Sequence, residues 1–173
     1  MKKIFAFALV AMMTLAANAQ VFVGGSLGYQ SSKPSKGAES VNTFKFAPEV
    51  GYNLDENWTI GLALDYTSTD NSVTTNSSFG VSIYGRYNYF KTGIATLFVE
   101  ANTGIEAYNH DGGNVFHIGV LPGVSFAVTD KLSLVAKTGV LGYKKYSSEA
   151  GGGSSFGVGV DNTDISLGLF YNF

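Results

Sequence analysis

The sequence predicts an all-β protein, an eight-stranded antiparallel up-and-down transmembrane β-barrel. Three observations predict this fold class. After residue 19, apolar and polar residues alternate with a period of two along almost the whole chain, as they do in strands with two different faces. The charges well inside these segments all fall on one face. The segments are also about 11 residues long, the length that a tilted strand needs to cross a bilayer.

The first 19 residues have the three parts of an export signal. Lys2 and Lys3 precede the apolar stretch IFAFALVAMMTLA, and the small residues Ala17-Asn18-Ala19 follow it as a cleavage site. The apolar stretch is shorter than the roughly 20 residues of a membrane-spanning helix. We therefore expect residues 1–19 to be a secretory signal peptide cleaved after Ala19, and residues 20–173 to form one barrel domain.

The composition excludes several classes of function. Charged residues make up 14% of the chain, against about 25% in typical soluble domains. Without Lys2 and Lys3, 9 of the 11 basic residues remain against 13 acidic ones, so the mature chain has a net charge of −4. It therefore lacks the excess of basic residues that is typical of proteins that bind nucleic acid. There is no cysteine, hence no disulfide, thiol chemistry or lipid attachment. No cofactor is expected.

Four strands are expected in the first half of the mature chain, at residues 21–31, 43–54, 58–68 and 78–90. In each of them the apolar side chains recur at every second position over most of the segment. They are, in order, Val21, Val23, Leu27 and Tyr29; Phe44, Phe46, Val50, Tyr52 and Leu54; Trp58, Ile60, Leu62, Leu64 and Tyr66; and Phe79, Val81, Ile83, Tyr87 and Tyr89.

Four more strands are expected in the second half, at residues 95–108, 115–128, 132–143 and 165–173. The same alternation delimits them. Their apolar residues are Leu97, Val99, Ala101 and Ile105; Phe116, Ile118, Val120, Val124, Phe126 and Val128; Leu132, Leu134 and Val140; and Ile165, Leu167, Leu169, Tyr171 and Phe173.

The glycines indicate which face of the sheet points inward. Most of those in strands share the charge-bearing face, whereas only Gly25, Gly85 and Gly142 lie on the apolar face. Glycine weakens strands, and a solvated outer face offers no reason for so many of them. The narrow interior of an eight-stranded barrel does, because it has little room for side chains. The polar face is therefore expected inside, with the apolar face against lipid. The glycines on the polar face are Gly24, Gly28, Gly51, Gly61, Gly80, Gly104, Gly119, Gly123, Gly139 and Gly168.

The expected connections alternate between short and long. Residues 55–57, 91–93 and 129–131 form tight turns, and the other connections are longer and rich in Ser, Gly, Asn, Asp and Thr. Short periplasmic turns and longer outer loops are typical of outer-membrane barrels. The longer connections are expected at residues 32–42, 69–77, 109–114 and 144–162.

With these features, residues 20–173 resemble the small eight-stranded outer-membrane β-barrels of Gram-negative bacteria, of the OmpA/OmpX type. The terminal ISLGLFYNF resembles the C-terminal assembly signal of that family, with Ile165, Leu167, Leu169, Tyr171 and Phe173 at alternate positions. The resemblance implies location in the outer membrane, contact with outer-membrane lipid, and recognition by the β-barrel assembly machinery during biogenesis.

The charges on the polar face are expected to pair across the lumen. Folding the chain about the turn at 91–93 sets Arg86 beside Glu100, and folding about residue 112 sets Glu106 across from His117. In a narrow interior without bulk water, interleaved charges of both signs should pair and close the barrel. The expected lumen network comprises Lys45, Glu49, Asp65, Arg86, Glu100, Glu106, His117 and Lys137.

Three classes of function follow from such a barrel. The first is a non-enzymatic role, either through outer loops that bind a ligand the sequence does not identify or as a structural part of the envelope. The second is a narrow channel or carrier for small or hydrophobic solutes. The third, catalysis on lipid A, would use His110 and Asp111 with loop serines, and is suggested only by the resemblance. With two histidines and no cysteine, no metal site is expected.

Overall fold

The computed structural model describes residues 20–32, 41–70, 75–109, 113–158 and 166–173. These residues form ten strands and one short 3-10 turn, η1, at Ser148–Ala150. None of them forms a helix long and apolar enough to cross a membrane. The strands are β1 (Val21–Ser32), β2 (Val41–Asn53), β3 (Trp58–Asp70), β4 (Thr75–Lys91), β5 (Ala95–Tyr108), β6 (Asn114–Ala127), β7 (Leu132–Lys137), β8 (Leu141–Tyr146), β9 (Ser154–Val158) and β10 (Ser166–Asn172).

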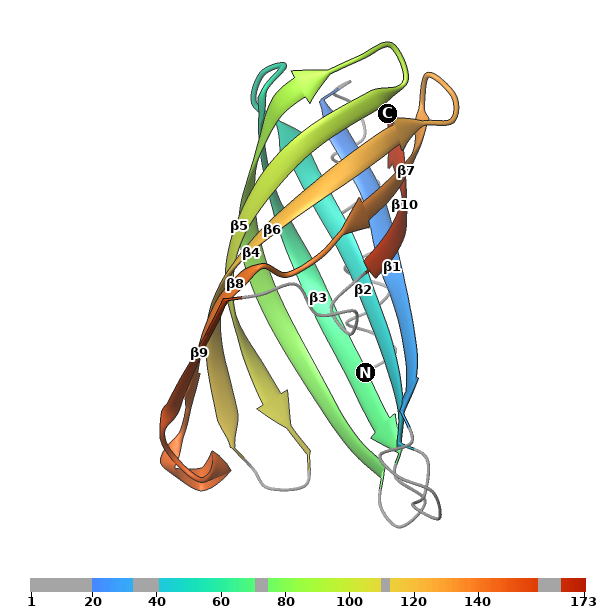
Figure 1. The fold of residues 1–173 in the computed structure, drawn as a ribbon. Helices are drawn as coiled ribbons and strands as arrows, with labels where there is room; N and C mark the ends of the chain where they lie inside the picture. Colours follow the sequence, from blue (N-terminus) through green and yellow to red (C-terminus); the bar gives the residue numbers. More distant parts are fainter. Residues whose placement is uncertain (1–19, 33–40, 71–74, 110–112, 159–165) are drawn as a thin grey trace.

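The strands close into an antiparallel barrel (Figure 1). Strands β1 to β6 pair with their sequence neighbours, and β10 completes the wall between β7 and β1. The closing ladder sets Gly25 opposite Leu169 and Leu27 opposite Leu167. Because the last strand hydrogen-bonds to the first, the sheet has no open edge over this ladder. The predicted eight-stranded up-and-down barrel is confirmed, with β7 and β8 together forming one wall segment.

The two faces of the wall differ as predicted. Large apolar side chains cover the outer surface; Leu27 and Ile83 are each 58% exposed. In contrast, the Glu49 and Glu100 side chains on the inner face are each only 1% exposed. The polar face is therefore inside, and the outer surface is apolar enough to contact lipid.

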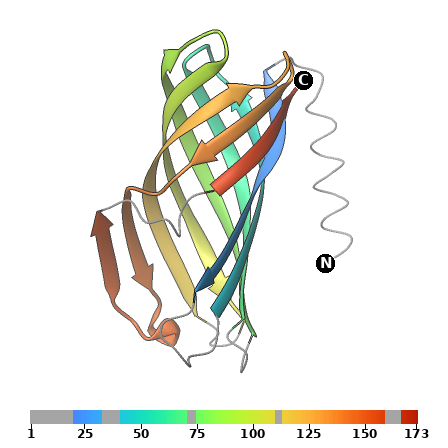
Figure 2. The same cartoon turned by 45° about the vertical axis from the view of Figure 1, so that its right-hand side comes forward.

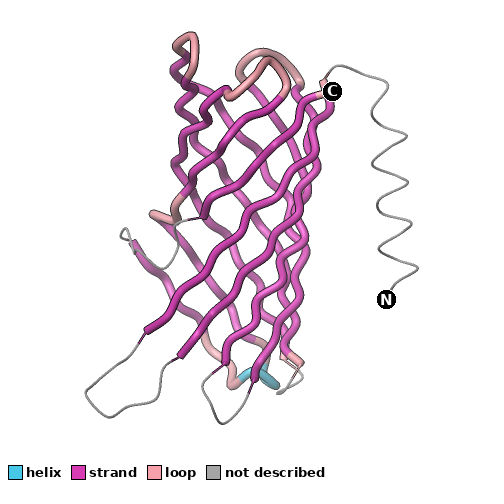
Figure 3. Tube along the Cα trace, turned by 90° about the vertical axis from the view of Figure 1, so that its right-hand side faces the viewer, coloured by secondary structure: helices cyan, strands magenta, loops and turns pink. Residues whose placement is uncertain are grey.

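Each of the three short turns is fixed by a polar side chain at or near its start. Asp55 Oδ1 accepts hydrogen bonds from the backbone N–H groups of Asn57 and Trp58, both at 2.7 Å. Thr92 Oγ1 accepts from the N–H of Ala95, and Thr129 Oγ1 from that of Leu132, both at 3.0 Å. Asp and Thr favour turns for this reason. Figure 3 shows these turns at the end of the barrel where the C-terminus lies.

The strand expected at 132–143 is instead two strands, β7 and β8, joined through residues 138–140. Gly123 pairs with Lys137, but Val120 pairs with Leu141, so three residues on one side lie opposite two on the other. The Thr138 N–H donates to the carbonyl of Pro122 at 3.2 Å, and Pro122 has no N–H to return. This β-bulge exchanges the two faces beyond it. Gly142, expected on the lipid face, therefore lies on the lumen side opposite Gly119.

The connection expected at 144–162 contains further structure. Strand β9 pairs antiparallel with β8, placing Phe156 opposite Tyr143. Figure 2 shows β8 and β9 as a two-stranded ribbon that leans away from β1. Among the described residues, β9 pairs with β8 alone.

Aromatic side chains and glycines share the interior. Phe22, Tyr84, Phe98 and Phe170 point inward and form the buried core with Ala63 and Val135. A Cβ added to any of several inward glycines would overlap one of these rings, closer than real Cβ contacts come. The pairs are Gly24 with Phe170, Gly51 with Phe22, Gly61 with Tyr84, and Gly123 with Phe98. The inward glycines thus make room for rings that fill the barrel.

Gly61→Val should disrupt the barrel, whereas Gly85→Val should not. A side chain at Gly61 meets the Tyr84 ring, while a Cβ at Gly85, on the outer face, has no atom within 4 Å. We expect Gly61→Val to lower the free energy of unfolding by about 1–3 kcal/mol or more, the usual cost of overpacking. Urea unfolding of both variants in the same detergent tests this. Equal loss in the two variants would contradict the packing account.

Candidate functional site

Four charged side chains form a buried layer across the middle of the lumen. Arg86 donates to Glu100 Oε2 from Nε at 3.1 Å and from Nη2 at 2.7 Å. Lys137 Nζ donates to Glu49 Oε1 at 2.8 Å and to Glu100 Oε1 at 3.1 Å. The Arg86 Nη2 atom also lies 4.0 Å from Glu49 Oε2. We call Glu49, Arg86, Glu100 and Lys137 the plug.

The plug is positioned by four different strands. Arg86 on β4 lies directly opposite Glu100 on β5, because a one-residue bulge between Asn88 and Phe90 shifts the register that begins at the 91–93 turn. Glu49 on β2 and Lys137 on β7 are 88 residues apart and meet only across the lumen. The side chains are 1–10% exposed. Burial without a counter-charge is costly, and here two carboxylates face two cations, so the layer is neutral.

Aromatic rings surround the plug. The Arg86 guanidinium carbon lies 4.3 Å from the ring centre of Phe98 and 5.4 Å from that of Tyr84. Lys137 Nζ lies 5.5 Å from the Tyr84 ring centre. These distances permit cation–π attraction, which is stronger away from water. The rings therefore hold the cations in place and fill the space around them.

The plug separates two spaces inside the barrel. A cavity of about 830 Å³ lies on the side of the long loops, and Glu49, Tyr84 and Lys137 contribute to its floor. A much smaller space of about 120 Å³ lies toward the short turns, lined by Arg86 and Phe98 among others. The interior is thus divided by one layer of side chains.

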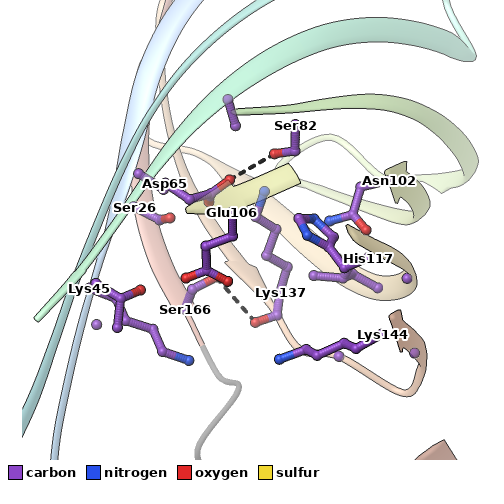
Figure 4. A pocket seen from close by; sticks show the side chains of 18 of the residues that line it. Ser26, Lys45, Asp65, Ser82, Asn102, Glu106, His117, Lys137, Lys144 and Ser166 are labelled. Carbon is purple, nitrogen blue, oxygen red and sulfur yellow. Dashed lines mark hydrogen bonds between the residues drawn. The ribbon is translucent and has the colours of Figure 1, made fainter. Parts of the chain in front are cut away.

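The remaining lumen residues line the larger cavity (Figure 4). Asp65 Oδ2 accepts from Ser82 Oγ at 2.8 Å, and Glu106 accepts from Ser78 Oγ. Lys45 lies opposite Thr67, which places it diagonal to Asp65 as expected.

One expected juxtaposition is wrong. Glu106 lies opposite Val115, and His117 lies opposite Gly104, so Glu106 and His117 are not directly across from each other. The ladder is offset by two residues from the one obtained by folding about residue 112. In a long connection, the number of residues that continue each strand is not set by the length of the connection. The register of the two strands therefore cannot be obtained from its midpoint.

Two kinds of lumen residue were not predicted from the sequence. Lys144 falls at the start of the connection expected at 144–162, whereas the bulge at 138–140 turns it inward, opposite His117. Pro122 and Gly139, both unusual in strand interiors, were the available signal. The inward ring of Tyr84 was also not predicted, because the apolar residues expected in its strand all lie on the other face.

Part of the predicted set lies outside the described residues. This applies to Ala17 and Ala19 of the cleavage site, to His110 and Asp111, and to Ile165 of the C-terminal signal.

The other members of the C-terminal signal lie at the closing ladder. Leu167 and Leu169 face outward, 56% and 52% exposed. Phe173 packs its ring 5.2 Å from that of Tyr171, and its N–H donates to Val21 O at 3.1 Å. The last residue therefore takes part in joining the chain ends.

Metal binding has no visible basis in the described part of the chain. No group of three or more His, Cys, Asp or Glu side chains is arranged there to hold a metal ion.

Comparisons with known proteins agree with this architecture. The crystal structure of Neisserial surface protein A (NspA) is similar, with a TM-score of 0.56 and 18% identity over 90% of this chain and 98% of that one. OmpT of Vibrio cholerae matches with a TM-score of 0.42 and 14% identity, over 91% of this chain but only 53% of its own length. No curated protein matches the sequence.

The family comparison covers nearly the whole sequence. Residues 4–173 match the family described as outer membrane protein beta-barrel domain. The fold, the apolar exterior and the polar interior are those expected of such a protein. The chain therefore belongs to the outer membrane protein beta-barrel family, and its place is the outer membrane.

Proposed function

We propose that this protein is a non-enzymatic outer-membrane barrel whose lumen is shut, and that it acts through its outer loops or as a structural part of the envelope. The observation that carries the proposal is the plug. Its four charged side chains are buried and joined by salt bridges with N···O distances of 2.7 to 3.1 Å. A pathway for ions would instead be lined by an open ring of one sign of charge.

Opening the plug would separate buried charges from their partners. Glu100 accepts hydrogen bonds from both Arg86 and Lys137, so moving either cation leaves the carboxylate partly uncompensated. Such a loss is large in a medium of low dielectric constant. The resting state of the barrel is therefore closed to hydrated solutes.

A narrow channel is the second candidate, and one observation favours it. The plug is a single layer with a space of about 830 Å³ on one side and about 120 Å³ on the other. Displacing that one layer would join the two spaces. Conductance therefore distinguishes the two candidates.

Biogenesis is proposed on the sequence pattern. Residues 1–19 would direct export and be removed after Ala19, and the terminal strand with Phe173 would be read by the β-barrel assembly machinery. The mature barrel would then contact outer-membrane lipid through its apolar exterior. A loop ligand, if one is bound, is a further partner that the sequence does not name.

Lys137→Met should destabilise the barrel. It leaves Glu49 and Glu100 to share Arg86, and one buried negative charge is then uncompensated. Removing one member of a buried pair costs about 3–5 kcal/mol. Adding Glu49→Gln restores neutrality and should recover part of the loss in urea unfolding. Lys145→Met, on the exposed outer face opposite Phe116, is the matched control and should change little.

Arg86→Ala should raise the conductance of the barrel in a planar bilayer above a wild-type baseline near zero. The Arg86 side chain fills part of the layer between the two spaces, and its charge neutralises that of Glu100. The substitution removes both. Lys145→Ala should leave the baseline unchanged. Steady conduction by the wild-type protein, unaltered in Arg86→Ala, would contradict the shut lumen and put the channel first.

Deleting Phe173 should lower the amount of folded, protease-resistant barrel in the outer membrane. Phe173 holds the end of β10 against β1, and an unpaired strand edge is not tolerated in lipid. Phe90→Ala removes another exposed aromatic near a turn and serves as the control. Equal surface levels of the deletion variant and the wild type at modest expression would rule out an assembly role.

A further inference from the structure

The cavity above the plug has acidic and basic groups in separate places. We propose that it binds a small dipolar solute, with the cationic group of the solute held by Asp65 and Glu106 and its anionic group by Lys144. This goes beyond a shut barrel, because it gives the closed lumen a ligand on its outer side. The three side chains come from β3, β5 and β8 and all line the cavity.

The two carboxylates flank a glycine. Gly80 pairs with Asp65 on one side and with Glu106 on the other, so the three residues form one row across β3, β4 and β5. A Cβ at Gly80 would lie 3.2 Å from the carbonyl oxygen of Ile105 and 3.5 Å from the Cβ of Asp65 and the Cα of Glu106. The row therefore sets the two acidic residues close together, with only a glycine between them.

Serine hydroxyls orient both carboxylates. Ser82 Oγ donates to Oδ2 of Asp65 at 2.8 Å, and Ser78 Oγ donates to Oε1 of Glu106. Tyr108 Oη also donates to Oε2 of Glu106 at 3.4 Å, and each carboxylate oxygen can accept more than one hydrogen bond. The pair is therefore held in place with capacity left to accept from an ammonium group.

The basic side chains approach from opposite walls. Figure 4 shows Lys45 and Lys144 extending toward one another across the cavity. Lys144 faces inward only because of the bulge at 138–140, and among the described residues it has no ion pair within 4.0 Å. The ammonium group of Lys144 so placed suits a carboxylate or another small anionic group.

The floor of the cavity favours a polar guest over an apolar one. Asn102 Oδ1 is buried without a hydrogen-bond partner among the described residues, and Asn102 lines this cavity. Buried polar atoms without partners are costly, so a guest that offers hydrogen bonds there is favoured.

The size and the charge balance set the class of ligand. A volume of about 830 Å³ is within the range of small-molecule sites. The cavity is lined by Lys45, Lys137 and Lys144 against Glu49, Asp65, Glu100 and Glu106, so the signs nearly balance. A guest with one charge would be attracted by one group and repelled by the other, whereas a dipolar guest satisfies both.

Three peptides of nearly equal size test the inference on the full mature protein in detergent. Diglycine is dipolar, acetyl-diglycine lacks the positive charge, and diglycine amide lacks the negative charge. Backbone amide chemical shifts of Gly119 and Gly142, which line the cavity, are followed by NMR and report binding there. We expect diglycine to bind about tenfold or more tightly than either blocked form, because each lost charge removes a charge-assisted hydrogen bond.

Two variants test which side chains bind the positive and the negative group of the peptide. In Asp65→Asn, diglycine should lose its advantage over acetyl-diglycine but keep its advantage over the amide; Lys144→Gln should do the reverse. Lys145→Gln, one residue away on the outer face, should change neither ratio. Equal affinity of the three peptides, no shift at tens of millimolar peptide, or an equal effect of Lys145→Gln would each overturn the inference. Bilayer conductance of Arg86→Ala is unaffected by these results, so the shut lumen stands or falls separately.

Discussion

The constraint on which this structure depends is that lipid offers no hydrogen-bond partner to the backbone. Strands can cross a membrane only if every N–H and C=O is paired within the sheet, which requires the last strand to close against the first. Here β10 meets β1 from Phe22 to Leu27, and the Phe173 N–H extends the contact to Val21. Closure in turn brings side chains from distant strands together in the lumen, as it does Glu49 and Lys137.

A closed barrel of eight strands has little interior space, and the chain fills it in a particular way. Glycine and a large ring alternate on neighbouring strands, as with Gly61 and Tyr84 or Gly123 and Phe98. The rings then lie against Arg86 and Lys137, whose charges are neutralised by Glu49 and Glu100. Packing and electrostatics thus act on the same layer, because the rings exclude the water that would otherwise weaken the ion pairs.

The position of that layer shapes the remainder of the lumen. It lies nearer the short turns, so most of the free volume is on the side of the loops. The walls of this outer space keep their polar groups apart rather than joined in one network, with Asp65 and Glu106 bonded to serines and Lys144 on the opposite wall. A shut barrel can in this way still present a polar recess toward the outside.

The sequence by itself determined the fold class, the inward face and most strand positions, because alternation and the exclusion of charge from one face are local properties. It also placed Arg86 beside Glu100, although the ladder next to the turn pairs Phe90 with Leu97 and would set Arg86 opposite Ala101 without the bulge between Asn88 and Phe90. Only the tertiary structure decided the rest. Glu49 meets Lys137 across the lumen, which depends on barrel closure between residues 88 apart in sequence. Lys144 and Gly142 turn inward because one bulge opposite Pro122 reverses the alternation, and alternation carries no record of an inserted residue.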